Sequence, residues 1–459
     1  MKYSSLLTAT LLLAAACTKP AEPMPTPTPP APSGETFTQY GTPFASVCDR
    51  QDATIYQVNM RTFGVQSNFQ GVTARLDSIK ALGVNVIYLM PIHPVGSLRG
   101  VNSPYCVKDY RAVNAEFGTL ADLRALIAGA HSRNMSVLID WVANHTAWDN
   151  AWITAHKDWY LQDGAGNIVI PPGTNYNDVA QLNFNTAAMR TEMINCMKYW
   201  VYTANIDGFR CDYADGVPFD FWQQAVSELR KINTHELLLL AEGNRSNHYD
   251  AGFDFTFGFN FFGQMKSVFA NNTAATSLNA LNSSELAGAT NGQQVVRYLT
   301  NHDVNSSDGT PQQLFGGASG ARSAFVVAAC MRGVPMIYNG QEVGTPYRLN
   351  FPFTGQDINW SLNPSVTADY KKVLAFRNGS AAIRRGDLTT YSTADICAFS
   401  KTTAADTALV ICNLRNGART FTLPAAFANT TFTDAMSGTQ VTLGTQVSLG
   451  AYGFFCLKL

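Results

Sequence analysis

The chain has 459 residues, enough for two or three domains rather than one small core. Hydrophobic residues make up 46% of the sequence and charged residues 14%, a composition typical of an ordinary globular protein. The net charge of -1 gives no electrostatic case for a nucleic-acid partner or for adsorption to an anionic membrane surface.

The N-terminus has the pattern of a targeting segment. Lys2 precedes an apolar run from Leu6 to Ala16, which is too short to span a bilayer as a mature helix. Residues 1–17 resemble a bacterial lipoprotein signal with Cys17 as the lipidated residue, and a secretory peptide cleaved after Ala16 is the alternative. Residues 18–36 include a proline-dense stretch and are predicted to form a disordered linker. We therefore expect an exported protein, anchored to a bacterial outer membrane or cell surface only through a lipid on Cys17.

From about Ala53 to Phe376, short apolar strands alternate with amphipathic helices, which indicates a parallel α/β fold. Val72, Leu76 and Ile79, for example, have the spacing of one helix that stops at Gly83. No glycine-rich phosphate loop follows a strand, which argues against an open doubly wound sheet. The economical arrangement is a closed (β/α)8 TIM barrel. Its strands are expected near residues 55, 86, 138, 208, 239, 254, 298 and 337.

Two segments depart from this alternation. Between His145 and about Thr186 lie about forty residues rich in Asp, Asn, Gly and Pro, and a loop of this length usually has a function. After Arg385 the pattern changes to short strands separated by turn residues, which predicts a C-terminal β-sandwich over residues 386–459. The barrel domain then covers residues 37–385 and includes an insertion at about 146–186, after strand 3.

Cysteine usage leaves disulfide bonding open. Without Cys17 the chain has eight cysteines, an even number that permits disulfides in an exported protein without proving them. Cys211 lies on a strand and is expected to face the surrounding helices as a free core thiol. The absence of a Cys-x-x-Cys pair argues against zinc. A bridge remains open among the C-terminal cysteines Cys397, Cys412 and Cys456.

Four polar clusters come directly after short apolar runs, where a barrel strand presents active-site residues at its C-terminal end. Three carboxylates in the order Asp, Glu, Asp suit chemistry at a glycosidic bond, where one group attacks the sugar, one moves a proton and one stabilises positive charge. A single such residue would more often be a buried, satisfied polar group, but four successive clusters argue against that interpretation. The clusters contain Asp140 with Asn144 and His145, Arg210 with Asp212, Glu242, and His302 with Asp303.

These clusters resemble motifs of the alpha-amylase family of glycoside hydrolases, a retaining family that acts on alpha-glucans. The resemblance runs from about Ala53 to the C-terminus. It implies the barrel fold, with the insertion as the family's small domain B, which forms one wall of the cleft. Further matching motifs are Ile-Tyr-Gln-Val at 55–58, Tyr-Leu-Met-Pro-Ile at 88–92, Val-Ala-Gln-Leu-Asn at 179–183 and Gly-Val-Pro-Met-Ile-Tyr-Asn-Gly-Gln-Glu at 333–342.

The resemblance assigns the catalytic roles. It makes Asp212 the nucleophile, Glu242 the general acid and base, and Asp303 the residue that stabilises the oxocarbenium-like transition state. Arg210 lies two residues before Asp212 on one strand, so both side chains point into the barrel and the guanidinium keeps the carboxylate ionised and oriented. A largely apolar cleft can supply the raised pKa that Glu242 needs as an acid.

The resemblance also assigns residues around the sugar. Two histidines of the family hydrogen-bond the sugar in the cleaved subsite, and a tyrosine lies beneath it. Asp140 and Asn144 are expected to support the site rather than to react. The substrate-binding residues of this chain are then Tyr105, His145, Arg210 and His302.

The usual calcium site of the family is incomplete in this sequence. Many members carry Lys and His three and four residues beyond the nucleophile, where they contact leaving-group sugars and calcium, but this chain has Asp215 and Gly216. Gln181 replaces the calcium-binding Asp of the domain B motif, so Asn144 is the one usual ligand clearly retained. We expect no required cofactor and no firmly assigned metal ligand. Carboxylates that could hold Ca²⁺ elsewhere in domain B are Asp149, Asp163 and Asp178.

The leading interpretation is a lipid-anchored alpha-amylase that cleaves alpha-1,4 bonds within starch and maltooligosaccharides. A cyclomaltodextrinase or neopullulanase keeps the chemistry and changes the substrate, although only the linker precedes the barrel where an extra N-terminal domain would be expected. A transglycosylase is also open, because cleft shape decides between water and sugar acceptors. A non-catalytic surface glycan-binding lipoprotein is disfavoured, since all three carboxylates are present.

Overall fold

The computed structural model describes residues 35–64 and 66–459, and the predicted signal, Cys17 and nearly all of the predicted linker lie outside them. The chain from Glu35 onward forms one compact unit. Glu35 is part of it, because its carboxylate pairs with Arg111 Nη1 at 2.6 Å. None of the helices in the described part combines the length and the apolar character that a bilayer crossing requires.

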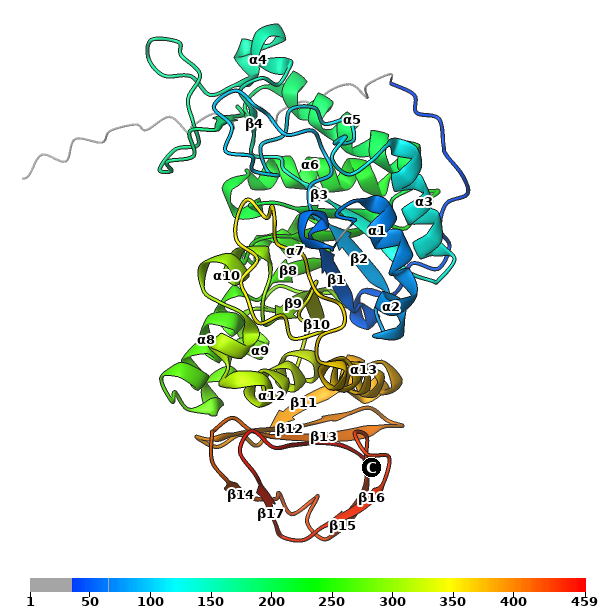
Figure 1. Ribbon diagram of the computed structural model, residues 1–459, viewed down its shortest axis with the longest axis vertical. Coiled ribbons are helices and arrows are strands. Elements are labelled where there is room, and N and C mark those ends of the chain that lie inside the picture. Colours follow the sequence, from blue (N-terminus) through cyan, green and yellow to red (C-terminus); the bar gives the residue numbers. More distant parts are fainter. Residues whose placement is uncertain (1–34, 65) are drawn as a thin grey trace, which may run out of the picture. The chain divides into compact units, whose positions relative to one another are not determined.

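Eight parallel strands close into a barrel at the predicted positions, which confirms the fold class (Figure 1). Each strand pairs with the next barrel strand along the chain, and β1 closes the ring against β10. Every residue of these strands is buried, because alternate side chains point into the barrel and toward the helices outside. The strands are β1 (Ile55–Val58), β2 (Val86–Leu89), β3 (Ser136–Trp141), β6 (Gly208–Cys211), β7 (Leu238–Ala241), β8 (Phe255–Phe257), β9 (Gln294–Tyr298) and β10 (Val334–Tyr338).

Helices cover the outside of the barrel. The single helix predicted from Val72 to Ile79 is instead two helices, α1 and α2, which meet at Arg75. Arg75 leaves helical geometry, and its guanidinium lies 3.9 Å over the ring of Trp360. The α-helices are α1 (Phe69–Ala74), α2 (Leu76–Ala81), α3 (Leu120–His131), α4 (Trp152–Ala155), α5 (Ala187–Ala204), α6 (Phe219–Arg230), α7 (Asn247–Asp250), α8 (Phe259–Ala270), α9 (Leu281–Ser284), α10 (His302–Ser307), α11 (Pro311–Leu314), α12 (Gly317–Cys330), α13 (Pro364–Gly379) and α14 (Ala381–Arg385). Short 3-10 helices are η1 (Arg50–Asp52), η2 (Met60–Thr62), η3 (Lys157–Trp159), η4 (Ala214–Gly216) and η5 (Ala275–Leu278).

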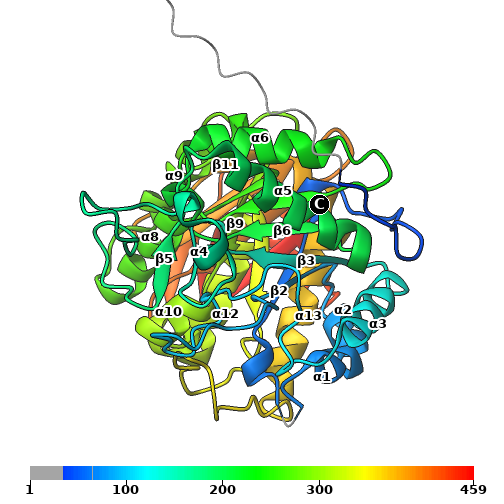
Figure 2. The same cartoon turned by 90° about the horizontal axis from the view of Figure 1, so that it is seen from above.

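The insertion after β3 carries a two-stranded antiparallel sheet of its own, β4 (His145–Ala147) and β5 (Val179–Gln181). In this pairing His145 lies opposite Gln181. Figure 1 shows α4 and β4 at one end of the barrel and the C-terminal strands at the other, and Figure 2 views the molecule from the α4 end. The insertion therefore lies at the end where the sequence predicts the active site.

Antiparallel strands form the C-terminal domain, as predicted. One sheet has the order β11-β12-β13-β18-β15-β16, and β14 pairs with β17. Its first sheet shares a core with the barrel, because Phe399 and Cys412 pack in the same apolar cluster as the barrel strands, while Phe421 and Phe432 belong to a separate small core. The strands are β11 (Asp387–Thr390), β12 (Ile396–Thr402), β13 (Thr407–Asn413), β14 (Arg419–Thr422), β15 (Thr430–Asp434), β16 (Gln440–Leu443), β17 (Gln446–Leu449) and β18 (Phe454–Lys458).

The eight cysteines in the described part of the chain are free thiols. Cys211 is buried, as predicted for a core thiol. Cys397 lies opposite Cys412 across β12 and β13, and Cys456 is buried on β18, but no bridge joins them. Burial raises the pKa of the Cys397 thiol to about 12, so it stays protonated at neutral pH.

Candidate active site

Arg210 lies at the centre of a carboxylate cluster. Its Nη1 donates hydrogen bonds to Asp140 Oδ1 at 2.7 Å and to Asp212 Oδ1 at 2.8 Å. Its Nη2 forms an ion pair with Glu242 Oε1. The Arg210 side chain is 1% exposed, so solvent screens these interactions little. One guanidinium thus faces three carboxylates, and the two predicted reacting groups contact its two terminal nitrogens.

The barrel register brings these residues to one level. Asp140 pairs with Arg210 across β3 and β6, and Cys211 pairs with Ala241 across β6 and β7. Asp212 and Glu242 each follow the last residue of their strand, so they leave neighbouring strands at the same height. Their backbone N–H groups continue the sheet ladder, because Asp212 donates to the carbonyl of Trp141 at 2.9 Å and Glu242 to that of Cys211 at 2.9 Å.

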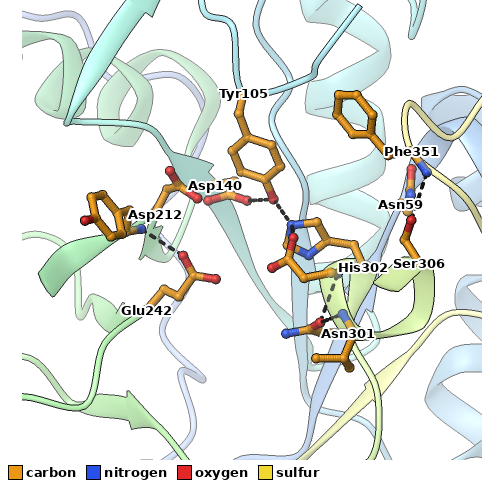
Figure 3. A network of polar contacts seen from close by, with 12 residues as sticks. Asn59, Tyr105, Asp140, Asp212, Glu242, Asn301, His302, Ser306 and Phe351 are labelled. Carbon is orange, nitrogen blue, oxygen red and sulfur yellow. Dashed lines mark hydrogen bonds and ion pairs between the residues drawn. The ribbon is translucent and has the colours of Figure 1, made fainter. Parts of the chain in front are cut away.

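A chain of hydrogen bonds links this cluster to His302 (Figure 3). Tyr105 Oη lies 2.9 Å from Asp140 Oδ2 and 2.7 Å from His302 Nε2. Gln57 Nε2 lies 2.8 Å from the other ring nitrogen of His302, and Tyr88 donates a second hydroxyl to Asp140 at 2.6 Å. A neutral His302 with its proton on Nε2 satisfies all of these contacts, and burial lowers the pKa of this histidine, which keeps it neutral.

Asp303 is the most open of the three predicted catalytic carboxylates. Its side chain is 60% exposed, and its Oδ1 lies 3.3 Å from His302 Nε2. The side chain of Asn301 accepts hydrogen bonds from the backbone N–H groups of Asp303 and Val304, at 3.0 and 2.9 Å, and so caps the start of α10. This cap fixes the backbone from which Asp303 projects.

Burial and crowding shift the acid equilibria of the cluster. Burial raises the pKa of Glu242 to about 7; Arg210 opposes this rise and Asp303 adds to it. Burial also raises the pKa of Asp212 above its usual range, against the opposing charge of Arg210. Because one cation serves several carboxyl groups, the cluster holds on to a proton near neutral pH, as a pair of acid and nucleophile requires.

His145 and Asn144 lie beside the cluster, in the insertion. Burial lowers the pKa of His145 to about 4, against a backbone hydrogen bond to Tyr105 that raises it. Asn144 Nδ2 lies 3.1 Å from His145 Nδ1 and donates to Gln181 Oε1 at 3.1 Å. In return, Gln181 Nε2 donates to Asn144 Oδ1 at 3.2 Å. The side chains of Asn144 and Gln181 therefore hydrogen-bond each other, and this pairing holds the Asn144 amide that contacts the His145 ring.

The donor set at this position does not fit the calcium ion that the family resemblance implies. The oxygens of Asn144 and Gln181 already accept hydrogen bonds from each other, and no carboxylate contacts either side chain in the described residues. Gly216 contributes no side chain. Among residues 35–64 and 66–459, no three His, Cys, Asp or Glu side chains are grouped as a metal site would need. A hard cation prefers several charged oxygen ligands, which this pair of amides lacks.

The segment after Asp212 differs from the family motif in sequence, and its residues are held by a set of local contacts. Tyr213 has a left-handed backbone, its N–H donates to Glu242 Oε2 at 2.8 Å, and it is 51% exposed. A Cβ at Gly216 would lie 2.0 Å from the Tyr213 ring, so only glycine leaves room for this rotamer. Asp215 accepts a hydrogen bond from the buried His248 at 2.7 Å and pairs with Arg245. Where the family resemblance expects Lys and His, this chain has Asp215 and Gly216, and the backbone of the exposed Tyr213 hydrogen-bonds Glu242.

The structure brings nearly all predicted site residues into contact. Tyr105, Asp140, Arg210, Asp212 and Glu242 join His302 and Asp303 in one network, with the pair Asn144 and His145 next to it. Sequence reasoning missed three further members. Two of them are polar groups inside otherwise apolar strands, which is a signal that could have revealed them. These members are Gln57, Tyr88 and Tyr213.

The family assignment follows from comparison with known proteins. Residues 49–171 and 173–357 match the family model described as "Alpha amylase, catalytic domain". The chain belongs to the alpha-amylase family. The match covers all eight barrel strands and each of the three predicted catalytic carboxylates.

Named relatives and solved structures agree with this family. Alpha-amylase MalA of Haloarcula japonica is 27% identical over 420 residues, which cover 86% of this chain and 60% of that protein. A cyclomaltodextrinase of Bacillus sp is 25% identical over 376 residues, covering 75% of this chain and 65% of the relative. The crystal structure of an alpha-amylase from Lactobacillus plantarum superposes with a TM-score of 0.81 at 26% identity, covering 89% of this chain and 99% of that one.

Proposed function

We propose that this chain hydrolyses alpha-1,4-glucosidic bonds in starch and maltooligosaccharides with retention of configuration. The observation that carries the proposal is the fork of Arg210, whose two terminal nitrogens contact Asp212 and Glu242. This contact keeps the two carboxyl groups close together, and a retaining mechanism needs a short separation with no water between them. The names of an alpha-amylase and a cyclomaltodextrinase among the relatives support an alpha-glucan substrate.

The first chemical step forms a glycosyl-enzyme. Asp212 attacks the anomeric carbon while protonated Glu242 gives its proton to the departing glycosidic oxygen. The raised pKa of Glu242, about 7, keeps this proton available at neutral pH. Asp303 and Tyr105 both approach Nε2 of His302, and the exposed Asp303 carboxylate stabilises the positive charge that develops on the sugar ring.

The second step releases the sugar. Ionised Glu242 removes a proton from water, which attacks the anomeric carbon and breaks its bond to Asp212. Two inversions return the alpha anomer. NMR of the first-formed reducing sugar, recorded before mutarotation, is expected to show that anomer. An initial beta anomer would exclude Asp212 as the nucleophile.

Cyclomaltodextrinase, neopullulanase and transglycosylase activities are the second candidates, because they use the same carboxylates. The segment around Tyr213 supports these alternatives, because its sequence departs from the family motif. It lies beside Glu242, the proposed proton donor, and thus next to the leaving group. Product analysis on starch, cyclodextrin and pullulan, with added maltose as an acceptor, separates these activities. A chain that binds starch without cleaving any of the three would instead be a glycan-binding protein.

We further propose that Cys17 carries a lipid anchor that holds this activity at a bacterial membrane. The supporting observation is the apolar segment that ends at Cys17 in the sequence. Cys17→Ser is expected to release the protein from the membrane fraction, because a short proline-rich sequence alone confers no membrane affinity. Continued membrane association of this variant would contradict the anchor.

A further inference from the structure

A cavity of about 420 Å³ lies at the end of the barrel opposite the carboxylate cluster. Its barrel residues come from the N-terminal ends of strands, since Gln294 begins β9 and Arg332 precedes β10 by two residues. The C-terminal domain supplies the other wall, from residues 386–388, Thr390 and Lys401 on β12. The cavity is thus built from both domains.

Positive charge exceeds negative charge in this cavity. Among the described residues, four cationic side chains line it, and Asp387 is the one lining carboxylate. Asp52 neutralises two of the cations, because it pairs with both Arg384 and Arg385. Arg332 and Lys401 have no ion pair with a carboxylate anywhere in the described residues. Two cations on the same cavity therefore lack an anionic partner.

Lys401 is the more unusual of the two. Lys401 is buried, with a relative exposure of 3%, and within the described part of the chain its ammonium donates only to the carbonyl of Ile383, at 2.6 Å. An ammonium has three N–H donors, so two stay without a protein acceptor. Burial, together with the nearby charges of Arg377 and Arg332, lowers the pKa of Lys401 to about 7, although Cys330 and Asp387 oppose this shift. A buried cation beside other cations is unfavourable unless an anion compensates it.

Neutral hydrogen-bonding groups complete the lining. Asn282 is 2% exposed, its Nδ2 donates to backbone carbonyls of the preceding turn, and its Oδ1 has no hydrogen-bond partner. A buried acceptor of this kind calls for a donor such as a hydroxyl. No aromatic ring from residues 35–64 or 66–459 lines the cavity, so these residues offer a neutral glucan no stacking surface. The other uncharged polar residues are Gln51, Asn279, Ser283, Gln294 and Thr390.

We propose that this cavity is a second, non-catalytic site that binds a phosphoryl group, either as free phosphate or as the phosphate ester of a small polyol. Lys401 and Arg332 meet the phosphoryl oxygens, and amide and hydroxyl groups such as Asn282 meet the P–OH or polyol hydroxyls. The site differs from the one assigned to glycoside hydrolysis in position and in charge. It stands independently of the proposed function.

Calorimetric titration of the full chain at pH 6.5 tests the proposal, with inorganic phosphate, glucose 6-phosphate, glucose and sulfate as probes. Saturable binding of phosphate or glucose 6-phosphate is expected, with no binding of glucose. Tighter binding of the ester identifies a polyol phosphate as the ligand, and binding of phosphate alone identifies the free anion. Absence of saturable binding, or equal binding of sulfate, overturns the phosphoryl assignment.

Variants assign the binding to the cavity. Lys401→Met and Arg332→Ala are each expected to weaken binding about tenfold or more, as loss of a charge-assisted hydrogen bond does. Lys401→Arg is expected to restore part of the affinity, and Lys372→Met, at an exposed lysine on α13, to leave it unchanged. If Lys401→Met does not fold, the exposed Arg332 gives the decisive variant. Undiminished binding by Arg332→Ala and Lys401→Met would place the ligand elsewhere.

Discussion

The two ends of the barrel differ in the sign of the charge that lacks a partner. At the C-terminal ends of the strands, the single guanidinium of Arg210 contacts three carboxylates. At the N-terminal ends, Arg332 and Lys401 line one cavity and contact none in the described part of the chain. The same scaffold therefore creates an anionic excess on one side and a cationic excess on the other.

This difference teaches what burial does to charge of each sign. Burial raises the pKa of Glu242 to about 7 and lowers that of Lys401 to about 7, so both groups can exchange a proton near neutral pH. Each imbalance costs folding free energy, and unpaired buried charge is commonly found where a protein binds or reacts. The anionic end suits proton transfer to a sugar, and the cationic end suits capture of an anion.

The largest effect is expected from Asp212→Asn, which removes one anion from the crowded end. The rate constant kcat should fall about 10⁴-fold or more, because the amide cannot form the glycosyl-enzyme. The melting temperature should stay the same or rise, since the remaining carboxylates share Arg210 more favourably. Initial rates on maltooligosaccharides and thermal unfolding measure both quantities. Near-normal turnover would remove Asp212 from the mechanism.

Removing one cation from each end of the barrel, by Arg210→Met or Lys401→Met, compares the two ends directly. Arg210→Met should lower the free energy of unfolding by about 3–5 kcal/mol, because it leaves several buried carboxylates without a partner. In Lys401→Met, measured without phosphate, we expect this free energy to stay the same or to rise by about 1 kcal/mol, since no ion pair is lost. Denaturant unfolding at pH 6.5 makes the comparison. Equal destabilisation by both substitutions would mean that the two ends do not differ in the way described.

The pH dependence of kcat/KM should report the protonation of Glu242, at the anionic end of the barrel. Since Glu242 must be protonated to act as an acid, kcat/KM should fall about tenfold per pH unit above pH 7. In Glu242→Gln, the fall of kcat/KM above pH 7 should disappear, together with most of the activity on glucans. The raised pKa also predicts that folding stability falls between about pH 4.3 and 7, where the unfolded carboxyl has lost its proton and the folded one still holds it. A profile that is flat from pH 6 to 9 would contradict Glu242 as the acid.

A smaller effect is expected at Tyr213. Tyr213→Ala should lower kcat/KM on maltotetraose about tenfold, within the range of a lost ring contact with the leaving sugar, while Tyr213→Phe should retain most of it. Alpha-maltosyl fluoride has no leaving sugar, so Tyr213→Ala should lower kcat/KM on this substrate much less than on maltotetraose. Tyr40→Ala, at another exposed tyrosine, is the matched control. Equal losses on both substrates would assign Tyr213 a purely structural role.

The smallest effect is expected from chelation. EDTA should shift the melting temperature by less than about 2 °C, equivalent to under about 1 kcal/mol, because the amides of Asn144 and Gln181 satisfy each other. Differential scanning calorimetry with and without added Ca²⁺ measures this shift. A large loss of stability that calcium reverses would show that an ion contributes to the fold.

Much of the architecture could be predicted because it depends on local sequence. Short apolar runs followed by polar residues gave the barrel strands, and the strand ends gave the positions of Asp212, Glu242 and Asp303. What could not be predicted depends on contacts between distant segments. Arg75 interrupts a helix where its guanidinium meets Trp360, far along the chain. The burial of Lys401 likewise arises only when the C-terminal sheet packs on the barrel, and a lone lysine in a strand carries no local sign of it.

The antiparallel pairing of His145 with Gln181 has a consequence for engineering. His145 is the first residue of β4, so a side chain expected to contact the sugar belongs to the sheet of the inserted segment itself. Grafting a different loop between β3 and α5 would therefore shift that imidazole unless the graft kept the register of β4 and β5. Replacements confined to residues 148–178 keep both strands, and they should also keep Leu161 and Val169, whose backbones hydrogen-bond Gln181 at 2.9 and 3.0 Å. Libraries that diversify substrate preference should take their crossover points inside those limits.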